Sequence, residues 1–431
     1  MQLLNEFIFR VILLNLLVIG GGFVGVTTAY YLSQKGMNVT VLEAQEKGGD
    51  FGATAGNAGL LSPSDAFAWA SPSALKVAIK SLLNSQLGIQ YKLHMDPALW
   101  GWTASFLSQC RSSKWVQNTD SKFRLAQYSI DNLADLRLAT NINFDASDQG
   151  IAYASRSPSN LKKLRSHFNF LEDRGLKLEL LDRDGLHEKL PLLQASSKTY
   201  AGAVFSPNCK TGDSAKFSLE LGRWCVENTK CRFVWGASVE SFLQKNNKIS
   251  SVLTSKGEFK ADAYVLAAGA HNGILAKQLD IKLPIYPIKG FSITAPLINT
   301  KMKPMSGFDD TDKLVSLSIF GDRLRISSSA VFDGFNTSHR QQDFQGILNL
   351  AKEILPDVAN YSAAKYWAGL RPMTPSSLPI LGPSPMQNLY LNVGHGNLGW
   401  TLACGTGKIV ADLIANEKPR VNISPFLFKA K

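Results

Sequence analysis

One arginine near the C-terminal end of the chain has a setting suited to binding a carboxylate. Arg371 belongs to the segment 369–375 and directly precedes Pro372. Because proline disfavours the helical conformation in the residue before it, the backbone here is expected to be extended and rigid. A guanidinium held in this way can offer two parallel N–H groups to a carboxylate. The alternative is a structural salt bridge or an exposed arginine.

A glycine-rich loop at residues 394–400 is the second candidate. It opens a helix of small residues that we predict over residues 401–415. The N–H groups and partial positive charge of such a helix end favour negative charge on a bound ligand. His395 lies between two glycines of the loop and either acts as a base or simply bonds the backbone. The residues expected to contact the ligand are Gly396, Leu398, Gly399, Trp400 and Thr401.

A dinucleotide-binding signature near the N-terminal end indicates what that ligand is. Gly20, Gly22 and Gly25 have the G-x-G-x-x-G spacing and, with Phe23 and Val24, follow an apolar run at 11–19 that is typical of a buried parallel strand. A helix is predicted over residues 26–34, ended by Lys35-Gly36, and a second strand over 38–42. The three glycines permit a tight turn, close approach of the pyrophosphate and close helix packing.

The residues after the second strand favour FAD over NAD. Glu43, followed by Ala44, lies 18 positions after Gly25 (43 − 25), close to the spacing of about 20 for an acidic residue that binds a ribose hydroxyl. Residues 48–59 then form a loop of small residues, where a bulky flat ring can lie against bare backbone. Asn57, Ala58 and Gly59 end this loop. A reduced flavin carries negative charge near N1, which the helix end at residue 399 would favour.

Mid-chain residues suggest that the chain returns to the same sheet. We predict strands at 248–254 and 258–266, joined by a turn at 255–257, and the second ends in small residues that include Ala268 and Gly269. Another strand at 232–235, followed by Val239, is expected near the adenine end of the cofactor.

Composition excludes several classes of protein. The 431 residues are 45% hydrophobic and 19% charged, which is typical of a globular protein and argues against disorder. The net charge of +12 is scattered, with its densest group at Lys162, Lys163 and Arg165, so a basic surface that serves solubility is favoured over nucleic-acid binding. Five cysteines lack metal-binding spacing and indicate a reducing compartment. The apolar run near the N-terminal end is too short to cross a bilayer, since about 20 residues are needed.

These motifs together resemble those of D-amino-acid dehydrogenase small subunits, a branch of the glycine oxidase and D-amino-acid oxidase family of flavoproteins. The resemblance runs from about residue 15 to about 416. It rests on NAGLLSP, DPALWGW, LLDRDGL, YPIKGFSIT, GLRPMTPSSLPILGP and LNVGHGNLGWTLACGTG. It implies noncovalent FAD, oxidative deamination of D-amino acids, and Arg371 as the ligand of the substrate carboxylate. Phe291 stands where the family commonly has tyrosine, and 376–377 are Ser-Ser where Asp-Gly is common.

The expected fold is α/β, with a Rossmann-like FAD-binding domain and an inserted α+β substrate domain. The FAD-binding domain is assigned to 1–86, 205–280 and 362–431, and the substrate domain to 87–204 and 281–361. Strand-like runs at 281–294, 314–320 and 323–328 indicate an antiparallel sheet. Core-facing helix stripes are predicted at Phe123, Ala126, Ile130 and Leu133, and at Leu161, Leu164, Phe168 and Leu171.

The resemblance implies hydride transfer from substrate Cα to flavin N5, with electrons passed to a quinone or another acceptor. The resulting imino acid is hydrolysed to a 2-oxo acid and ammonia. Alternatives are oxidation of a secondary amine (D-hydroxyproline, sarcosine or glycine), an RNA-modifying flavin enzyme, and a non-catalytic flavin subunit. We expect a cytoplasmic protein, with contact to the cytoplasmic side of the inner membrane left open. The oligomeric state and any role of His395 or Lys289 also stay open.

Overall fold

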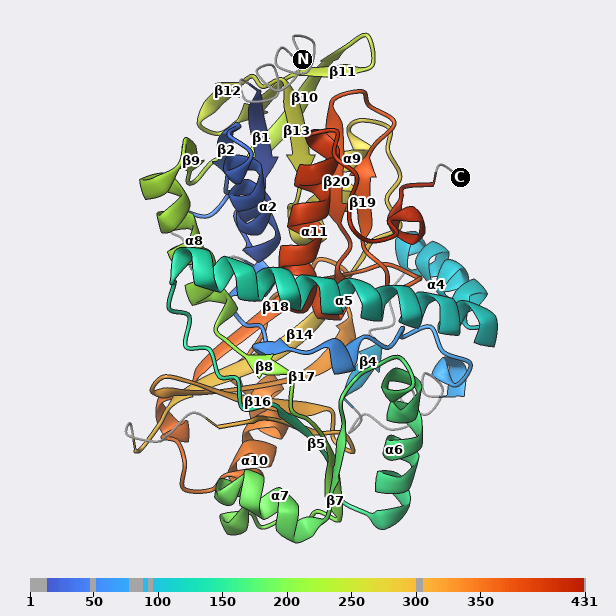
Figure 1. Cartoon of the computed structure of the whole chain (residues 1–431), viewed down its shortest axis with the longest axis vertical. Helices are drawn as coiled ribbons and strands as arrows, with labels where there is room; N and C mark the ends of the chain where they lie inside the picture. Colours follow the sequence, from blue (N-terminus) through green and yellow to red (C-terminus); the bar gives the residue numbers. More distant parts are fainter. Residues whose placement is uncertain (1–13, 47–51, 77–87, 92–95, 300–304, 430–431) are drawn as a thin grey trace.

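The computed structural model describes residues 14–46, 52–76, 88–91, 96–299 and 305–429. Two sheets dominate this part of the chain, one in each half of the elongated molecule (Figure 1). Helices and further strands cover both sheets. The predicted α/β architecture, with a Rossmann-like unit joined to a sheet-and-helix unit, is confirmed.

The first sheet has six strands in the order β19-β20-β13-β1-β2-β9. The five strands from β20 to β9 are parallel, and β19 pairs antiparallel at one edge. This is the doubly wound pattern, which buries both faces of its central strands. The bounds are β1 Asn15–Ile19, β2 Asn38–Leu42, β9 Cys231–Val234, β13 Ala263–Leu266, β19 Ile380–Pro383 and β20 Leu389–Val393.

Each face of this sheet has its own cover. On one face, alternate residues such as Leu16 and Val18 pack with α2 (Phe23–Gln34), α8 (Ser214–Asn228) and α11 (Gly399–Ile414). On the other face, Leu17 and Ile19 pack against a three-stranded sheet. That sheet consists of β10 (Val239–Lys245), β11 (Lys248–Thr254) and β12 (Gly257–Phe259).

Three local predictions for this half need correction or trimming. The first helix begins at Phe23, not at residue 26, because Gly22 already provides its N-cap. The strand predicted over 258–266 is two strands, β12 and β13, because the two ends of this segment pair in different sheets. The first strand is seen from Asn15, and residues 11–13 of its predicted range lie outside the described residues.

The second sheet has nine strands, eight of them in the order β18-β14-β17-β16-β15-β5-β7-β6, with β4 paired to β17. It is antiparallel as predicted, except for the parallel pairs β15·β5 and β17·β4. The bounds are β4 Ile89–Tyr91, β5 Ile151–Ser155, β6 Glu179–Leu181, β7 Gly202–Ser206, β14 Tyr286–Pro296, β15 Gly307–Asp310, β16 Val315–Phe320, β17 Arg323–Phe332 and β18 Lys365–Met373. The strand predicted from residue 281 thus begins at Tyr286, and the one predicted to end at 328 continues to Phe332.

The helices of the second half are α6 (Pro158–Glu172), α7 (Arg183–Lys189) and α10 (Gln345–Ile354), with α4 (Pro97–Gln109) near the junction of the two halves (Figure 1). Shorter elements include β3 (Leu60–Leu61), β8 (Lys210–Thr211) and α9 (Asn272–Lys277). The stripe predicted on α6 is observed, since Phe168 and Leu171 are buried and Leu161 and Leu164 are partly buried.

The long helix α5 (Ser112–Thr140) lies across the middle of the molecule in Figure 1. Its predicted stripe is observed, with Phe123, Ala126 and Leu133 buried and Ile130 partly buried. The stripe packs against α11, in contrast to the expectation that it belongs to the substrate domain. Likewise β18 was expected in the FAD-binding part but pairs in the nine-stranded sheet. The domain boundaries therefore stay a proposal.

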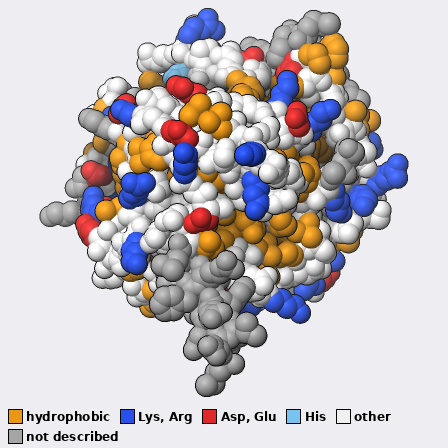
Figure 2. All heavy atoms as spheres, turned by 90° about the horizontal axis from the view of Figure 1, so that it is seen from above, with side chains coloured by type: hydrophobic (Ala, Val, Ile, Leu, Met, Phe, Trp, Pro, Cys, Tyr) orange, Lys and Arg blue, Asp and Glu red, His pale blue; other side chains and the backbone are white. Residues whose placement is uncertain are grey.

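No helix among the described residues combines the length and hydropathy needed to cross a membrane. On the face shown in Figure 2, lysine and arginine side chains are scattered among neutral and hydrophobic ones. This agrees with the scattered basic charge in the sequence. All five cysteines are free thiols.

Candidate functional site

A cavity of about 1570 Å³ lies between the two sheets. Ligand pockets for small molecules usually measure about 300–1,000 Å³, so this one has room for a dinucleotide and a substrate. Its walls come from the glycine turn, the small-residue loop, the end of β13, the face of the nine-stranded sheet and the loop before α11. Most predicted site residues line it: Gly20, Gly22, Phe23, Val24, Glu43, Ala44, Asn57, Ala58, Val239, Ala268, Gly269, Arg371, Gly396, Leu398 and Gly399.

Four predicted site residues, Gly25, Gly59, Trp400 and Thr401, do not line the cavity. A Cβ atom at Gly25 would collide with the carbonyl oxygen of Gly20, and one at Gly59 would collide with the Phe320 ring. These glycines therefore shape the turn and the loop. Trp400 is 2% exposed and packs edge-on against Phe217. Its neighbour Thr401 accepts a hydrogen bond from the Ser62 N–H at 3.0 Å.

The glycine turn presents backbone to the cavity. Gly20 has φ of 112° and lies close to the Ala267 carbonyl at the end of β13. Gly22 caps α2 without a side-chain hydrogen bond, and the first turn of the helix lines the cavity, so its N–H groups are available to a pyrophosphate. Thr54 accepts one of them, from Phe23, at 3.3 Å.

Glu43 stands at the end of β2, where the spacing predicts it. Its carboxylate accepts hydrogen bonds from the N–H of Gly21 at 2.7 Å and of Gln45 at 2.9 Å. These bonds hold the side chain at the cavity wall, and each oxygen keeps lone pairs for ribose hydroxyls.

The small-residue loop is anchored by an arginine that sequence reasoning did not single out. Arg325 on β17 donates from Nη1 to the carbonyl oxygens of Ala55 and Asn57, both at 2.9 Å, and from Nε to Thr294 at 2.6 Å. Burial lowers the pKa of Arg325 to about 10. The only sequence signal is that Arg325 alternates with apolar residues in a strand.

The loop before α11 is held by a buried histidine and a buried lysine. His395 is 4% exposed, its Nε2 lies 3.1 Å from the Thr406 hydroxyl, and burial lowers its pKa to about 3. It is therefore a poor base at neutral pH. Lys122 of α5, which the sequence analysis missed, donates to Asn397 Oδ1 at 3.1 Å and to the Phe67 carbonyl at 3.4 Å.

Arg371 lines the cavity from β18, where it pairs with Ile288 of β14. Its backbone is extended, as Pro372 predicts. The guanidinium lies over Gly290, where a Cβ would collide with it, and donates from Nη1 to the Ser329 carbonyl at 2.8 Å. No carboxylate of the described residues lies within ion-pair distance, and burial lowers its pKa to about 10. A structural salt bridge is thus not what the geometry shows.

Lys289, the next candidate on β14, has a different environment. Its Nζ pairs with Asp333 at 3.1 Å and donates to the Ser338 carbonyl, and it does not line the cavity. The end of β13 does line it, and there Asn272 accepts from the Ala268 N–H at 2.7 Å. Together the bare glycine turn, Glu43 and the open helix ends fit a flavin dinucleotide, while Arg371 supplies an unpaired cation next to it.

Comparisons with known proteins agree with this geometry. The family described as DAO, FAD dependent oxidoreductase, matches residues 15–413. A relative from Mesorhizobium japonicum named D-amino acid dehydrogenase 2 is 39% identical over 409 residues, which cover 95% of this chain and 98% of that protein. A D-amino acid dehydrogenase from Granulibacter bethesdensis is 34% identical over 95% of this chain and 97% of its own length.

Among solved structures, glycine oxidase from Geobacillus kaustophilus superposes with a TM-score of 0.72 at 20% identity, over 97% of this chain and 99% of that one. L-proline dehydrogenase from P. horikoshii gives 0.70 at 19% identity, over 96% of each chain. At these identities the likeness concerns the fold. With the family match across most of its length, the chain belongs to the DAO family of FAD-dependent oxidoreductases.

Proposed function

We propose that this protein oxidises D-amino acids to 2-oxo acids and ammonia and passes the electrons to a quinone or another acceptor. The observation that carries the substrate class is the partly buried guanidinium of Arg371, which lines the cavity without an ion partner among the described residues. The names of the relatives support the D configuration.

Arg371 would bind the substrate carboxylate. A partly buried cation without an ion partner has lost part of its hydration and kept its charge, so a carboxylate that enters the cavity offsets part of this desolvation cost. Gly290 lets the guanidinium lie flat on the sheet, and the bond to Ser329 fixes one edge. The remaining N–H groups can bind a carboxylate through two parallel hydrogen bonds. This fixes the position of Cα next to them.

FAD, when bound, would accept a hydride from the substrate Cα. The chain itself holds the cofactor through Gly20, Gly22 and Glu43, and orients the substrate through Arg371. The helix end at Gly399 and the buried Lys122 place positive charge beside the loop at 396–399, which favours an electron-rich ring there. Burial lowers the pKa of His395 to about 3, so its imidazole is a weak base, and the proposed mechanism assigns it no proton transfer.

The experiment is anaerobic mixing of the FAD-loaded protein with matched panels of D- and L-amino acids while the absorbance of oxidised flavin is followed. D-amino acids should bleach the flavin, and their L enantiomers should not. Bleaching by sarcosine or D-hydroxyproline alone would identify a secondary-amine oxidase instead. Failure with every amine would indicate a non-catalytic flavin subunit.

Re-oxidation then identifies the acceptor. We expect the reduced protein to react faster with a quinone analogue than with oxygen. Binding to anionic vesicles would support a peripheral association with the membrane. Salt-sensitive binding to RNA would contradict the expectation that the protein has no nucleic-acid partner. Sedimentation would establish the oligomeric state.

A further inference from the structure

A row of mostly polar side chains crosses the nine-stranded sheet on the face that lines the cavity. Residues paired across neighbouring strands project to the same face of a sheet. The pairing brings six such residues into one row, one from each of six adjacent strands: Trp367, Ser292, Ser327, Ser316, Asp309 and Tyr153. Four of them line the cavity, namely Trp367, Ser327, Ser316 and Asp309.

The hydroxyls in this row are not satisfied by the protein. Ser327 is 6% exposed, Ser292 is buried, and neither hydroxyl has a hydrogen-bond partner among the described residues. Buried hydroxyls are nearly always bonded, so an unpartnered one at a cavity wall points to a ligand. Ser316 uses its own hydroxyl to donate to Asp309 Oδ2 at 2.6 Å.

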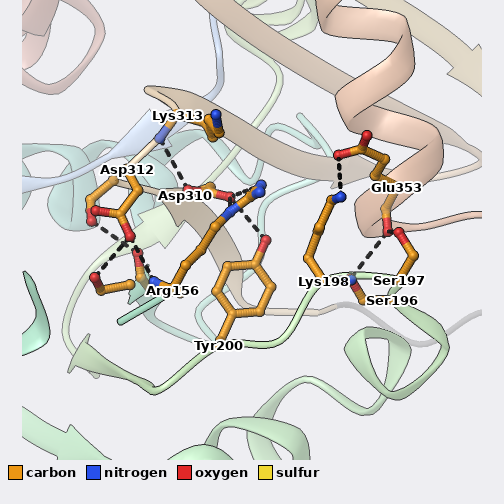
Figure 3. A network of polar contacts seen from close by, with 12 residues as sticks. Arg156, Ser196, Ser197, Lys198, Tyr200, Asp310, Asp312, Lys313 and Glu353 are labelled. Atoms are coloured by element: carbon orange, nitrogen blue, oxygen red, sulfur yellow. Dashed lines mark hydrogen bonds and ion pairs between the residues drawn. The ribbon is translucent and has the colours of Figure 1, made fainter. Parts of the chain in front are cut away.

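Asp309 contrasts with its neighbour Asp310 on the same strand. Asp310 projects to the opposite face, where Arg156 donates to it from Nε at 2.8 Å and Tyr200 donates at 3.0 Å (Figure 3). Asp309 has only Ser316, and no lysine or arginine of the described residues lies within 4.0 Å of it. One carboxylate is thus neutralised inside the protein, and the other faces the cavity without a cation.

A second carboxyl increases the negative character of this wall. Asp65 also lines the cavity and bonds to the Tyr153 hydroxyl at 3.1 Å. Burial, with the nearby charges of Asp65 and Asp310, raises the pKa of Asp309 to about 7, and burial raises the pKa of Asp65. A cation bound beside these carboxyls would oppose the upward shift of their pKa and favour their ionised forms. The ammonium of Lys122 interacts electrostatically with Asp65 and so compensates only part of the negative charge of the two carboxylates.

Arg371 and Asp309 are separated by the length of a long side chain. The Arg371 guanidinium reaches Ser329 on β17, and Asp309 lies two strands and two residues away, which corresponds to about 12 Å at ordinary strand spacings. An extended lysine spans about 7.5 Å from carboxylate to ammonium, given bonds of about 1.5 Å. A hydrogen bond of about 2.8 Å at each end extends this to about 13 Å.

We propose that Asp309, with Ser316 and Ser327, forms a subsite for the cationic end of the substrate side chain, which selects D-amino acids with basic side chains such as D-lysine and D-arginine. The inference rests on the proposed function, because Arg371 must hold the carboxylate at the other end. D-alanine is too short to reach the subsite. D-norleucine reaches it without a charge to offer.

The test compares D-lysine with D-norleucine as substrates of the FAD-loaded protein and of the Asp309→Asn variant. The wild type should prefer D-lysine in kcat/KM, and the variant should lose about 30-fold or more of this preference, the lower range for removing one partner of a buried charge pair. The change should appear mainly in KM. The exposed Asp322, at the turn between β16 and β17, provides a matched control: Asp322→Asn should leave the preference unchanged.

A binding measurement separates this inference from the proposed function. By calorimetry, 6-aminohexanoate, which has no α-amine to oxidise, should bind more tightly than hexanoate to the wild type but not to Asp309→Asn. If Asp309→Asn fails to fold, Ser327→Ala is the alternative variant. The Ser327 hydroxyl has no hydrogen-bond partner among the described residues, so its removal breaks no bond within the protein. It should weaken the binding of 6-aminohexanoate selectively, by about 10-fold or more, which corresponds to the loss of one hydrogen bond to a charged group.

Equal binding of the two acids by the wild type would overturn the subsite, even if D-norleucine and D-alanine are oxidised and the proposed function stands. A clear preference for 6-aminohexanoate in a protein that oxidises no D-amino acid would support the subsite and contradict the proposed function.

Discussion

Replacing Arg371 with methionine should weaken substrate binding strongly while leaving the fold intact or more stable. Methionine has nearly the length of arginine, can fill the space over Gly290 and carries no charge. Within the described part of the chain, the bond to the Ser329 carbonyl is the guanidinium's only hydrogen bond to the protein. Few native interactions are therefore lost.

The magnitudes follow from burial. The pKa of Arg371 is lowered from 12.5 to about 10 by desolvation. At about 1.4 kcal/mol per pKa unit, the charged form costs the substrate-free fold on the order of 3 kcal/mol. Methionine removes this cost but leaves the Ser329 carbonyl without its donor, which costs about 1–3 kcal/mol. The net change in the free energy of unfolding should lie between zero and about 2 kcal/mol of stabilisation.

The assay pairs denaturant unfolding with steady-state kinetics on a small D-amino acid. For the variant we expect KM to rise by about 100-fold or more, as for removal of one partner from a buried charge pair. FAD content should match that of the wild type. A carboxylate inhibitor should raise the Tm of the wild type but not of the variant.

Two results would refute this reasoning. An unchanged KM would remove Arg371 from the substrate site. A loss of several kcal/mol of stability at unchanged flavin content would mean that the guanidinium is a structural group whose charge the fold needs.

The remaining predictions concern the cofactor walls and pH. Gly25→Ala should abolish FAD binding in a spectral titration, because a Cβ there collides with the Gly20 carbonyl; normal FAD content would contradict this role. Lys122→Met should speed FAD release about tenfold, since one charge-assisted bond to the loop at 396–399 is worth about 1.5 kcal/mol, and stopped-flow dilution measures it. In the folded protein the pKa of His395 is about 3, below its value of about 6.5 in the unfolded chain. The free energy of unfolding should therefore fall as the pH decreases from about 6.5 towards 3. In His395→Gln this part of the pH dependence should be absent from the unfolding curves. In the folded protein the pKa of Asp309 is raised to about 7. Its contribution to the free energy of unfolding is therefore fully present below about pH 4 and is lost as the pH rises towards 7. Asp309→Asn should remove this pH dependence of the free energy of unfolding.

The cofactor half was largely predictable because its signals are local. Gly20 to Gly25, the strand at 38–42 and Glu43 lie within one βαβ unit, where spacing alone predicts the geometry. The extended backbone of Arg371 followed from Pro372. Its free guanidinium did not, because the absence of an ion partner is a property of the packed fold.

The rest of the site depends on contacts between distant segments. Lys122 reaches Asn397 across 275 positions, and Arg325 reaches Ala55 across 270. No period or spacing in the sequence reports such pairs. The split of the predicted strand 258–266 has the same origin, since its two ends pair with different sheets. Asp309 and Asp310 look alike in the sequence and differ only by the face of β15 on which each lies.

The most direct test of the central claim is a titration of the FAD-loaded protein with D-alanine and with L-alanine in the absence of oxygen. The proposed function predicts that D-alanine bleaches the flavin fully and yields one pyruvate and one ammonia per FAD, and that L-alanine leaves the spectrum unchanged. Bleaching by both enantiomers, or by neither D-alanine nor any longer D-amino acid, would contradict the claim.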